Sequence, residues 1–112
     1  MVAFELEGQP FSALNGGPLF KFNEAVSLQA YCDSQKEIDY YWERLTEGGD
    51  PKAQQCGWLK DKYGLSWHVV AKRLLDMLGD AKSPGSERAM AAMPRMKKFD
   101  IAALDRAYAG QS

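Results

Sequence analysis

The fold of this chain is constrained most by segment 34–47, whose residue spacing predicts an amphipathic helix. Ser34 and Glu37 stand three positions apart, as in a capping box, where the serine oxygen and the glutamate each satisfy a free backbone N–H. Four apolar residues follow at the i, i+3, i+4, i+7 spacing of one helical face: Ile38, Tyr41, Trp42 and Leu45. Two glycines then end the helix, because glycine adopts the left-handed conformation at little cost. We therefore expect a helix that packs these four side chains against a sheet.

Alternating apolar and polar residues predict strands before this helix. Residues 2–8 alternate apolar side chains with glutamates, a turn is expected at 8–10, and residues 11–14 return as the second strand of a hairpin. A further strand is predicted over 25–31. Its polar residues share one face: Ser27, Gln29 and Tyr31.

The second half of the chain predicts another hairpin and three shorter helices. The hairpin consists of 57–60, a turn at 61–64, and 65–70. Its return strand can be aligned with the first hairpin, which places Ser12 opposite His68 and suggests a repeated unit. Serine, proline and aspartate at helix starts and glycine at helix ends predict helices over 73–78, 84–93 and 101–109.

Composition limits the class of protein. The chain has 112 residues, of which 46% are hydrophobic, and this predicts a folded domain rather than a disordered chain. Its apolar runs fall short of the roughly 20 residues that a membrane helix needs, so we expect no membrane partner. The net charge of −1 gives no bulk attraction to nucleic acid. Cys32 and Cys56 suit a reducing compartment, so we expect a cytoplasmic protein.

Five strings carry a resemblance to a known family. They are FELEGQPF at 4–11, ALNGGP at 13–18, FKF at 20–22, CGWLKDKYGLSW at 56–67 and MKKFDIAAL at 96–104. With the predicted order of elements, these strings make the chain similar to the PhnB-like branch of the vicinal oxygen chelate superfamily, which includes glyoxalase I and bleomycin-resistance proteins. Many members of this branch carry the name 3-demethylubiquinone 3-methyltransferase.

The resemblance implies an α+β fold of the glyoxalase-like type. It implies a βαβββ module, preceded by the last hairpin of a truncated first module and followed by C-terminal helices. We expect residues 1–79 to form an incomplete paired domain and residues 80–112 to form a helical extension packed on it. Family members normally begin with a further β-α-β stretch, so the hairpin at 2–14 would lack neighbours. We therefore expect a homodimer whose chains complete each other's sheet or cup.

The resemblance also implies positions for a metal. In metal-using relatives the ligands lie on the first and last strands of each module, and here those positions fall at Ala25 and His68, with Ser12 from the first module. Alanine cannot ligate a metal and serine is a poor ligand, whereas Glu24 stands beside Ala25. His68 and Glu24 are therefore the weak metal candidates. We expect no cofactor, with a divalent metal as the alternative.

The polar strand residues favour a small-molecule pocket. Alternation puts four polar side chains on the cup side if the module is built as in the relatives, and a serine and a tryptophan join them as wall residues. The candidates are Ser12, Ser27, Gln29, Trp58, Ser66 and His68. The competing interpretation of His68 is a half-buried side chain bonded to the hydroxyl of Ser27 or Ser66.

Three functions are compatible with these features. The first is the binding of a small organic molecule in a cup-shaped sheet, without chemistry. The second is a metal-assisted enzyme of the isomerase or dioxygenase type, and the third is the methyltransferase of the family name. Ala25 at an implied ligand position favours the first over the second. A glycine-rich strand-to-helix turn that would hold a methyl donor is missing, which weighs against the third.

Overall fold

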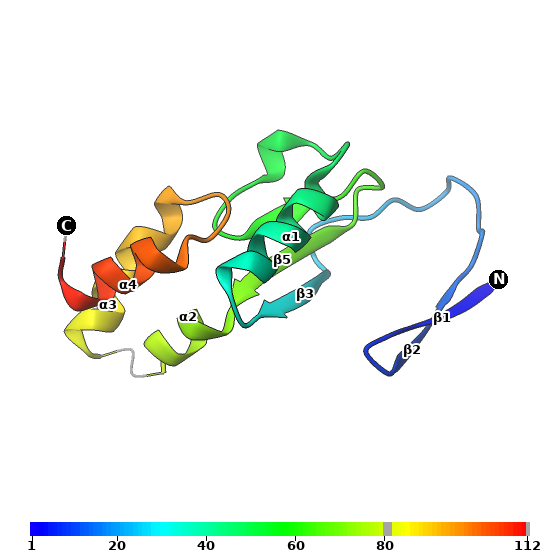
Figure 1. The fold of residues 1–112 in the computed structure, drawn as a ribbon. Helices are drawn as coiled ribbons and strands as arrows, with labels where there is room; N and C mark the ends of the chain where they lie inside the picture. Colours follow the sequence, from blue (N-terminus) through cyan, green and yellow to red (C-terminus); the bar gives the residue numbers. More distant parts are fainter. Residues whose placement is uncertain (80–81, 112) are drawn as a thin grey trace.

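The fold combines two sheets and four helices in the part of the chain that the structure describes. This part covers residues 1–79 and 82–111 of a computed structural model. The α+β class expected from the sequence is confirmed. The molecule is elongated, measuring 50 × 31 × 25 Å along its principal axes. Figure 1 shows the reason, because the N-terminal hairpin stands apart from the rest of the chain.

The larger sheet has three strands, β3 (Ser27–Cys32), β4 (Trp58–Lys60) and β5 (Ser66–Ala71), in the order β3-β5-β4. β3 is parallel to β5, and β4 is antiparallel to it. The crossover between the parallel strands contains α1 (Gln35–Thr46), which contacts all three strands and covers one face of the sheet (Figure 1). The segment between α1 and β4 holds a short 3₁₀ turn, η1 (Pro51–Ala53).

Helix α1 begins and packs almost as the sequence predicts. The Ser34 hydroxyl accepts a hydrogen bond from the Glu37 N–H at 3.2 Å, so the predicted cap is present. Ile38 is fully buried, and Trp42 and Leu45 pack against the same core. The expectation for Tyr41 is wrong, because this side chain is 37% exposed. It lies at the margin of a wide apolar face, where a phenol can keep its hydroxyl in water.

The smaller sheet is a hairpin of β1 (Val2–Leu6) and β2 (Gln9–Ala13). Its two-residue turn has positive φ at both Glu7 (49°) and Gly8 (81°), the geometry of a type I′ turn. The turn expected at 8–10 is therefore displaced by one residue, and Pro10 lies inside β2 opposite Glu5. A long connection without regular strands joins the hairpin to β3 (Figure 1).

The C-terminal helices are α2 (Lys72–Met77), α3 (Pro84–Ala92) and α4 (Ile101–Ala109), with a 3₁₀ turn η2 (Met93–Arg95) after α3. Ser83 caps α3 through a 3.1 Å bond from the Ser86 N–H, and Asp100 caps α4 through a 3.1 Å bond from the Ala103 N–H. Gly110 ends α4 in the left-handed conformation. The three predicted helices are thus confirmed. Among the described residues, no helix is long and apolar enough to cross a membrane.

A shared core joins the sheet to the C-terminal helices. Leu59 and Val69 of the sheet are buried in the same cluster as residues of the C-terminal part, which are Ala89, Phe99 and Leu104. The Gln35 side chain adds a polar link, because its Nε2 donates to the Phe99 carbonyl and its Oε1 accepts from the Ile101 N–H at 2.8 Å. The division at residue 79 into two domains stays a prediction.

Candidate functional site

Five of the six predicted pocket residues lie on one face of the larger sheet. Leu59 of β4 and Val69 and Ala71 of β5 share a buried core with Ile38 of α1. Alternation therefore places the intervening side chains on the opposite, open face, which α1 does not cover and on which Ser66 is nevertheless buried. The strand register forms two rows across this face. One row is Gln29, His68 and Trp58, and the other is Ser27, Ser66 and Lys60.

The sixth candidate is separated from the others. Ser12 lies on β2 of the N-terminal hairpin, opposite Ala3, so the described chain does not bring it to the open face. The resemblance placed it there because a paired module was assumed. Alternation alone placed the other polar residues, and it depends only on the local strand.

His68 is held by a ring stack and a backbone hydrogen bond. Its ring lies parallel to that of Trp58, with the ring centroids 4.2 Å apart and an interplanar angle of 4°. Its Nε2 lies 3.1 Å from the Cys56 carbonyl oxygen, and Nδ1 is buried without a hydrogen-bond partner. Because a carbonyl only accepts, Nε2 carries the proton and Nδ1 is the free acceptor. The competing expectation of a bond to a serine hydroxyl is wrong, since Cys56 supplies the partner.

Burial sets the protonation state of this histidine. It lowers the pKa of His68 below the ordinary value, although the bond to the Cys56 carbonyl opposes this shift. Phe99 contributes to the burial, with its ring centroid 6.1 Å from that of His68. The side chain is therefore neutral at neutral pH.

The Cys56-Gly57 turn connects His68 to the C-terminal segment. Cys56 and Gly57 both have positive φ, 54° and 83°, and the flanking Gln55 and Trp58 pair with each other. The Cys56 and Gly57 N–H groups donate to the carbonyls of Met96 and Lys97, both at 2.7 Å. This contact could not be predicted from the sequence, because nothing local to Cys56 indicates a partner some 40 positions away.

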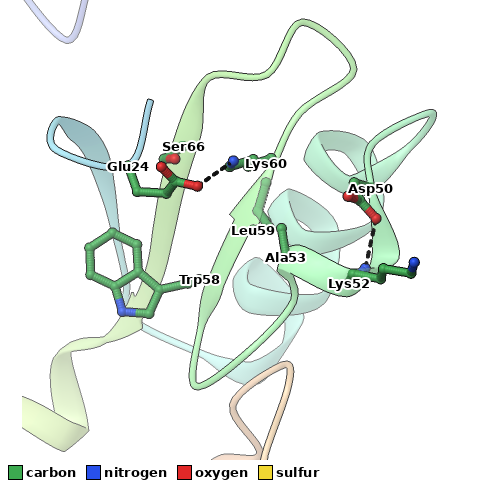
Figure 2. A pocket seen from close by; sticks show the side chains of 8 residues that line it. All are labelled: Glu24, Asp50, Lys52, Ala53, Trp58, Leu59, Lys60 and Ser66. Atoms are coloured by element: carbon green, nitrogen blue, oxygen red, sulfur yellow. Dashed lines mark hydrogen bonds and ion pairs between the residues drawn. The ribbon is translucent and has the colours of Figure 1, made fainter. Parts of the chain in front are cut away.

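A cavity of about 450 Å³ lies at the edge of the sheet beside β4. Figure 2 shows the side chains that line it: Glu24, Asp50, Lys52, Ala53, Trp58, Leu59, Lys60 and Ser66. Lys60 and Glu24 form an ion pair with Nζ and Oε1 2.6 Å apart, and the ammonium lowers the pKa of the Glu24 carboxyl. The Asp50 carboxylate accepts a hydrogen bond from the Lys52 N–H at 2.9 Å.

The cavity matches the predicted site only in part. Trp58 and Ser66 were predicted and line it, whereas Gln29 and His68 lie on the same face without lining it. Sequence reasoning missed Lys60, although its parity with Trp58 on β4 was the available signal. It also missed the residues of the 50–53 segment, whose place beside β4 no local pattern shows.

The residues present do not fit a divalent metal. The described residues contain no group of three or more His, Cys, Asp or Glu side chains able to hold an ion. The Nε2 proton of His68 bonds to a carbonyl, which leaves the buried Nδ1 as its one possible ligand atom, and the Glu24 carboxylate is paired with Lys60. Ala25 offers no side-chain donor. The donor set expected from the resemblance is therefore not assembled here.

The strand-to-helix turn does not fit the methyl donor that the family name implies. Asp33 and Ser34 make up the whole connection between β3 and α1, with no glycine to let a ligand approach the backbone. Ser34 itself occupies the helix start by accepting from Glu37. One free N–H at this helix start is therefore already bonded to the protein's own side chain.

The two thiols do not resemble nucleophiles. Burial, together with the nearby carboxylates of Glu37 and Asp33, raises the pKa of Cys32 to about 11. Burial also raises the pKa of Cys56. Both side chains therefore stay protonated and weakly reactive at neutral pH.

Comparison with known proteins identifies the family. The sequence profile of the 3-demethylubiquinone-9 3-methyltransferase family matches residues 1–70, which is more than half of the chain. The chain belongs to this family. The PhnB-like resemblance seen in the sequence strings is thereby confirmed.

A solved relative of the PhnB-like family also resembles this chain. It is a putative 3-demethylubiquinone-9 3-methyltransferase, the PhnB protein from Bacillus cereus, with 34% sequence identity and a TM-score of 0.48. The match covers 62% of this chain and 61% of the other, so this chain spans less than two thirds of that relative's length. No curated protein matches the sequence.

Proposed function

We propose that this PhnB-like protein binds a small organic molecule in the cavity beside β4. The observation that carries the proposal is the cavity itself, whose volume of about 450 Å³ suits a drug-sized ligand. Trp58 gives it a half-exposed aromatic wall, and Lys60 and Ser66 give it polar groups. An aromatic wall with a few placed polar groups is typical of small-molecule sites.

The architecture behind this proposal is a glyoxalase-like module. The β3-α1-β4-β5 order, with β3 parallel to β5, supports the interpretation of this part of the chain as the second half of a paired cup. In this arrangement the open sheet face forms one wall of the cup. The free thiols of Cys32 and Cys56 support a reducing compartment, so the cytoplasm is the proposed location.

A homodimer is part of the same proposal. The hairpin places Phe4, Leu6 and Phe11 on one face, and Phe4 and Leu6 are 42% and 43% exposed. An isolated two-stranded hairpin is at best marginally stable in water, so this face needs a cover. A second copy supplies one without a new surface, since a two-fold pairing uses the same patch twice. Light scattering over a dilution series tests this, and a well-folded monomer at micromolar concentration would refute it.

The binding proposal is tested by thermal unfolding of the intact chain against a panel of small organic molecules. A molecule that binds only the folded state raises the melting temperature by mass action. We expect at least one such molecule, and we expect Trp58→Ala to abolish its effect while α1 and the core remain folded. Stabilisation that persists in Trp58→Ala would place the binding site elsewhere.

A further inference from the structure

The cavity beside β4 pairs an aromatic wall with a fixed cation. We propose that it takes a planar aromatic anion, whose ring stacks on Trp58 and whose acidic group binds Lys60 in place of Glu24. This inference rests on the proposed small-molecule function and names the chemical class of the ligand.

The indole ring of Trp58 has one face covered by protein and one face free. One face of Trp58 is covered by the parallel ring of His68, yet Trp58 remains 39% exposed and lines the cavity. The free area is therefore on the opposite face and the edges of the indole. The stack with His68 fixes the ring plane, and His68 itself is fixed by the Cys56 carbonyl. A flat ligand ring meets a surface that is already ordered, so it loses little entropy on stacking.

The Lys60 ammonium is spaced from the indole by the geometry of β4. Lys60 follows Trp58 by two positions on β4, so both side chains leave the same face of the strand. Two such positions lie roughly 6–7 Å apart along a strand. This spacing suits a fused or single aromatic ring that carries its acid group at one end. Ser66, opposite Lys60 across the strands, adds a hydroxyl beside that group.

The ion pair of Lys60 and Glu24 favours an anionic ligand over a cationic one. Lys60 extends from a strand and its side chain is 29% exposed, whereas the Glu24 side chain is 74% exposed on the long connection before β3. Figure 2 shows the Glu24 carboxylate directed at the Lys60 ammonium. An exposed ion pair of this kind contributes little stability, so a ligand acid can displace the glutamate easily. The Lys60 ammonium therefore stays in the site, whereas the Glu24 carboxylate can be replaced by the acidic group of a ligand.

The experiment compares four probes by calorimetric titration of the full chain. They are 2-naphthoate, the neutral 2-naphthalenemethanol, the cationic 2-naphthylmethylamine and the non-planar cyclohexanecarboxylate. We expect 2-naphthoate to bind about tenfold more tightly than each of the others, because only it satisfies both Trp58 and Lys60. Lys60→Gln should remove this advantage, and Glu24→Gln should increase naphthoate affinity by removing the competing carboxylate.

The matched control is Lys36→Gln, which removes an exposed lysine from α1, away from the cavity. It should leave naphthoate affinity unchanged. Equal binding of the naphthoate and the alcohol, both lost in Trp58→Ala, would overturn the anion subsite and leave the proposed binding function standing. Tighter binding of the amine, or binding of none of the four probes, would also overturn the inference. The wider panel of molecules judges the proposed function separately.

Discussion

The β1–β2 hairpin and the β4–β5 hairpin share a cross-strand ring pair and differ in what lies beside them. Phe4 stacks on Phe11 with ring centroids 5.5 Å apart, and Trp58 stacks on His68 with centroids 4.2 Å apart. β5 has β3 on its other edge and α1 over one face, whereas in the described part of the chain β1 and β2 pair only with each other. Every residue of β1 is exposed, and Val69 of β5 is fully buried.

The comparison separates two causes of hairpin structure. Both hairpins have regular strand pairing, the first through a two-residue turn and the second through the longer connection at 61–65. Burial comes only from neighbours that are remote in the sequence, and it supplies most of the stability. The packed hairpin should therefore respond to substitutions that the free hairpin tolerates.

A matched pair of leucines should give the largest difference. Leu59→Ala, at a side chain 1% exposed, should lower the free energy of unfolding by about 2–5 kcal/mol because it leaves a cavity. Leu6→Ala, at 43% exposure, should cost less than about 1 kcal/mol in dilute solution. Urea unfolding of both variants measures this. Equal losses in dilute solution would mean that the free hairpin is packed within the monomer.

A matched pair of glycines should separate turn strain from contact. Gly57 and Gly8 each occupy the second position of a two-residue turn, with φ of 83° and 81°. A Cβ at Gly57 would lie 2.5 Å from Phe99 Cε2, whereas a Cβ at Gly8 would meet nothing within 4 Å.

Both alanine variants therefore carry the left-handed strain of about 1–2 kcal/mol, but only one is overpacked. Gly57→Ala should be less stable than Gly8→Ala by about 1–3 kcal/mol in chemical unfolding. If the two lose the same stability, Phe99 does not close over the turn.

A smaller effect should come from the titration of His68, the histidine of the packed hairpin, which makes the stability of the chain depend on pH. His68 is the only histidine of the chain, and burial lowers its pKa in the folded state. Below the unfolded pKa of about 6.5, the unfolded chain then binds more protons, so stability falls as the pH falls toward the folded pKa. The slope cannot exceed about 1.4 kcal/mol per pH unit.

An NMR titration of this one imidazole measures the folded pKa directly. In a chain that carries both Ser12→His and His68→Gln, the new histidine lies on exposed β2 and should titrate near the ordinary value. The pH-dependent loss of stability between pH ~6.5 and the folded pKa should disappear in that chain. Its persistence would assign the loss to other groups.

The smallest expected effect is that of metal removal. Because the described residues assemble no group of three or more possible ligands, we expect no tightly bound divalent ion, and a chelator should leave the melting temperature unchanged. Elemental analysis of protein purified without added metal provides the direct measurement. One ion per chain, bound by His68, would favour the metal-assisted enzyme instead.

Local features were predictable from the sequence, and remote contacts were not. The caps at Ser34, Ser83 and Asp100 lie where expected, because each bond joins residues three positions apart. Strand parity correctly placed His68 on the face opposite α1. The partner of His68 was not predictable, since the carbonyl of Cys56 is presented by a turn whose geometry depends on Met96 and Lys97.

The same limit applies to the cavity and to the turn of the first hairpin. Lys60 meets Glu24 only because the connection before β3 comes within reach of the lysine side chain, and sequence patterns do not fix the path of such a connection. In the first hairpin, Glu7 rather than Gln9 adopts a turn conformation, because the two-residue turn matches the strand twist better than a longer one.

The Cys56-Gly57 turn has a consequence for how the chain folds. All four of its backbone polar groups are used, two by Met96 and Lys97 and two by His68 and Val69. Until residues 96–97 arrive, two amide donors lack partners and the ring of Phe99 is missing from the side of His68. We therefore expect the sheet face and the segment at 96–99 to become ordered in one cooperative step. Slow hydrogen exchange at the Cys56 and Gly57 amides would show that this turn opens only when the packed part of the protein unfolds. The amides of the β1–β2 hairpin should exchange faster.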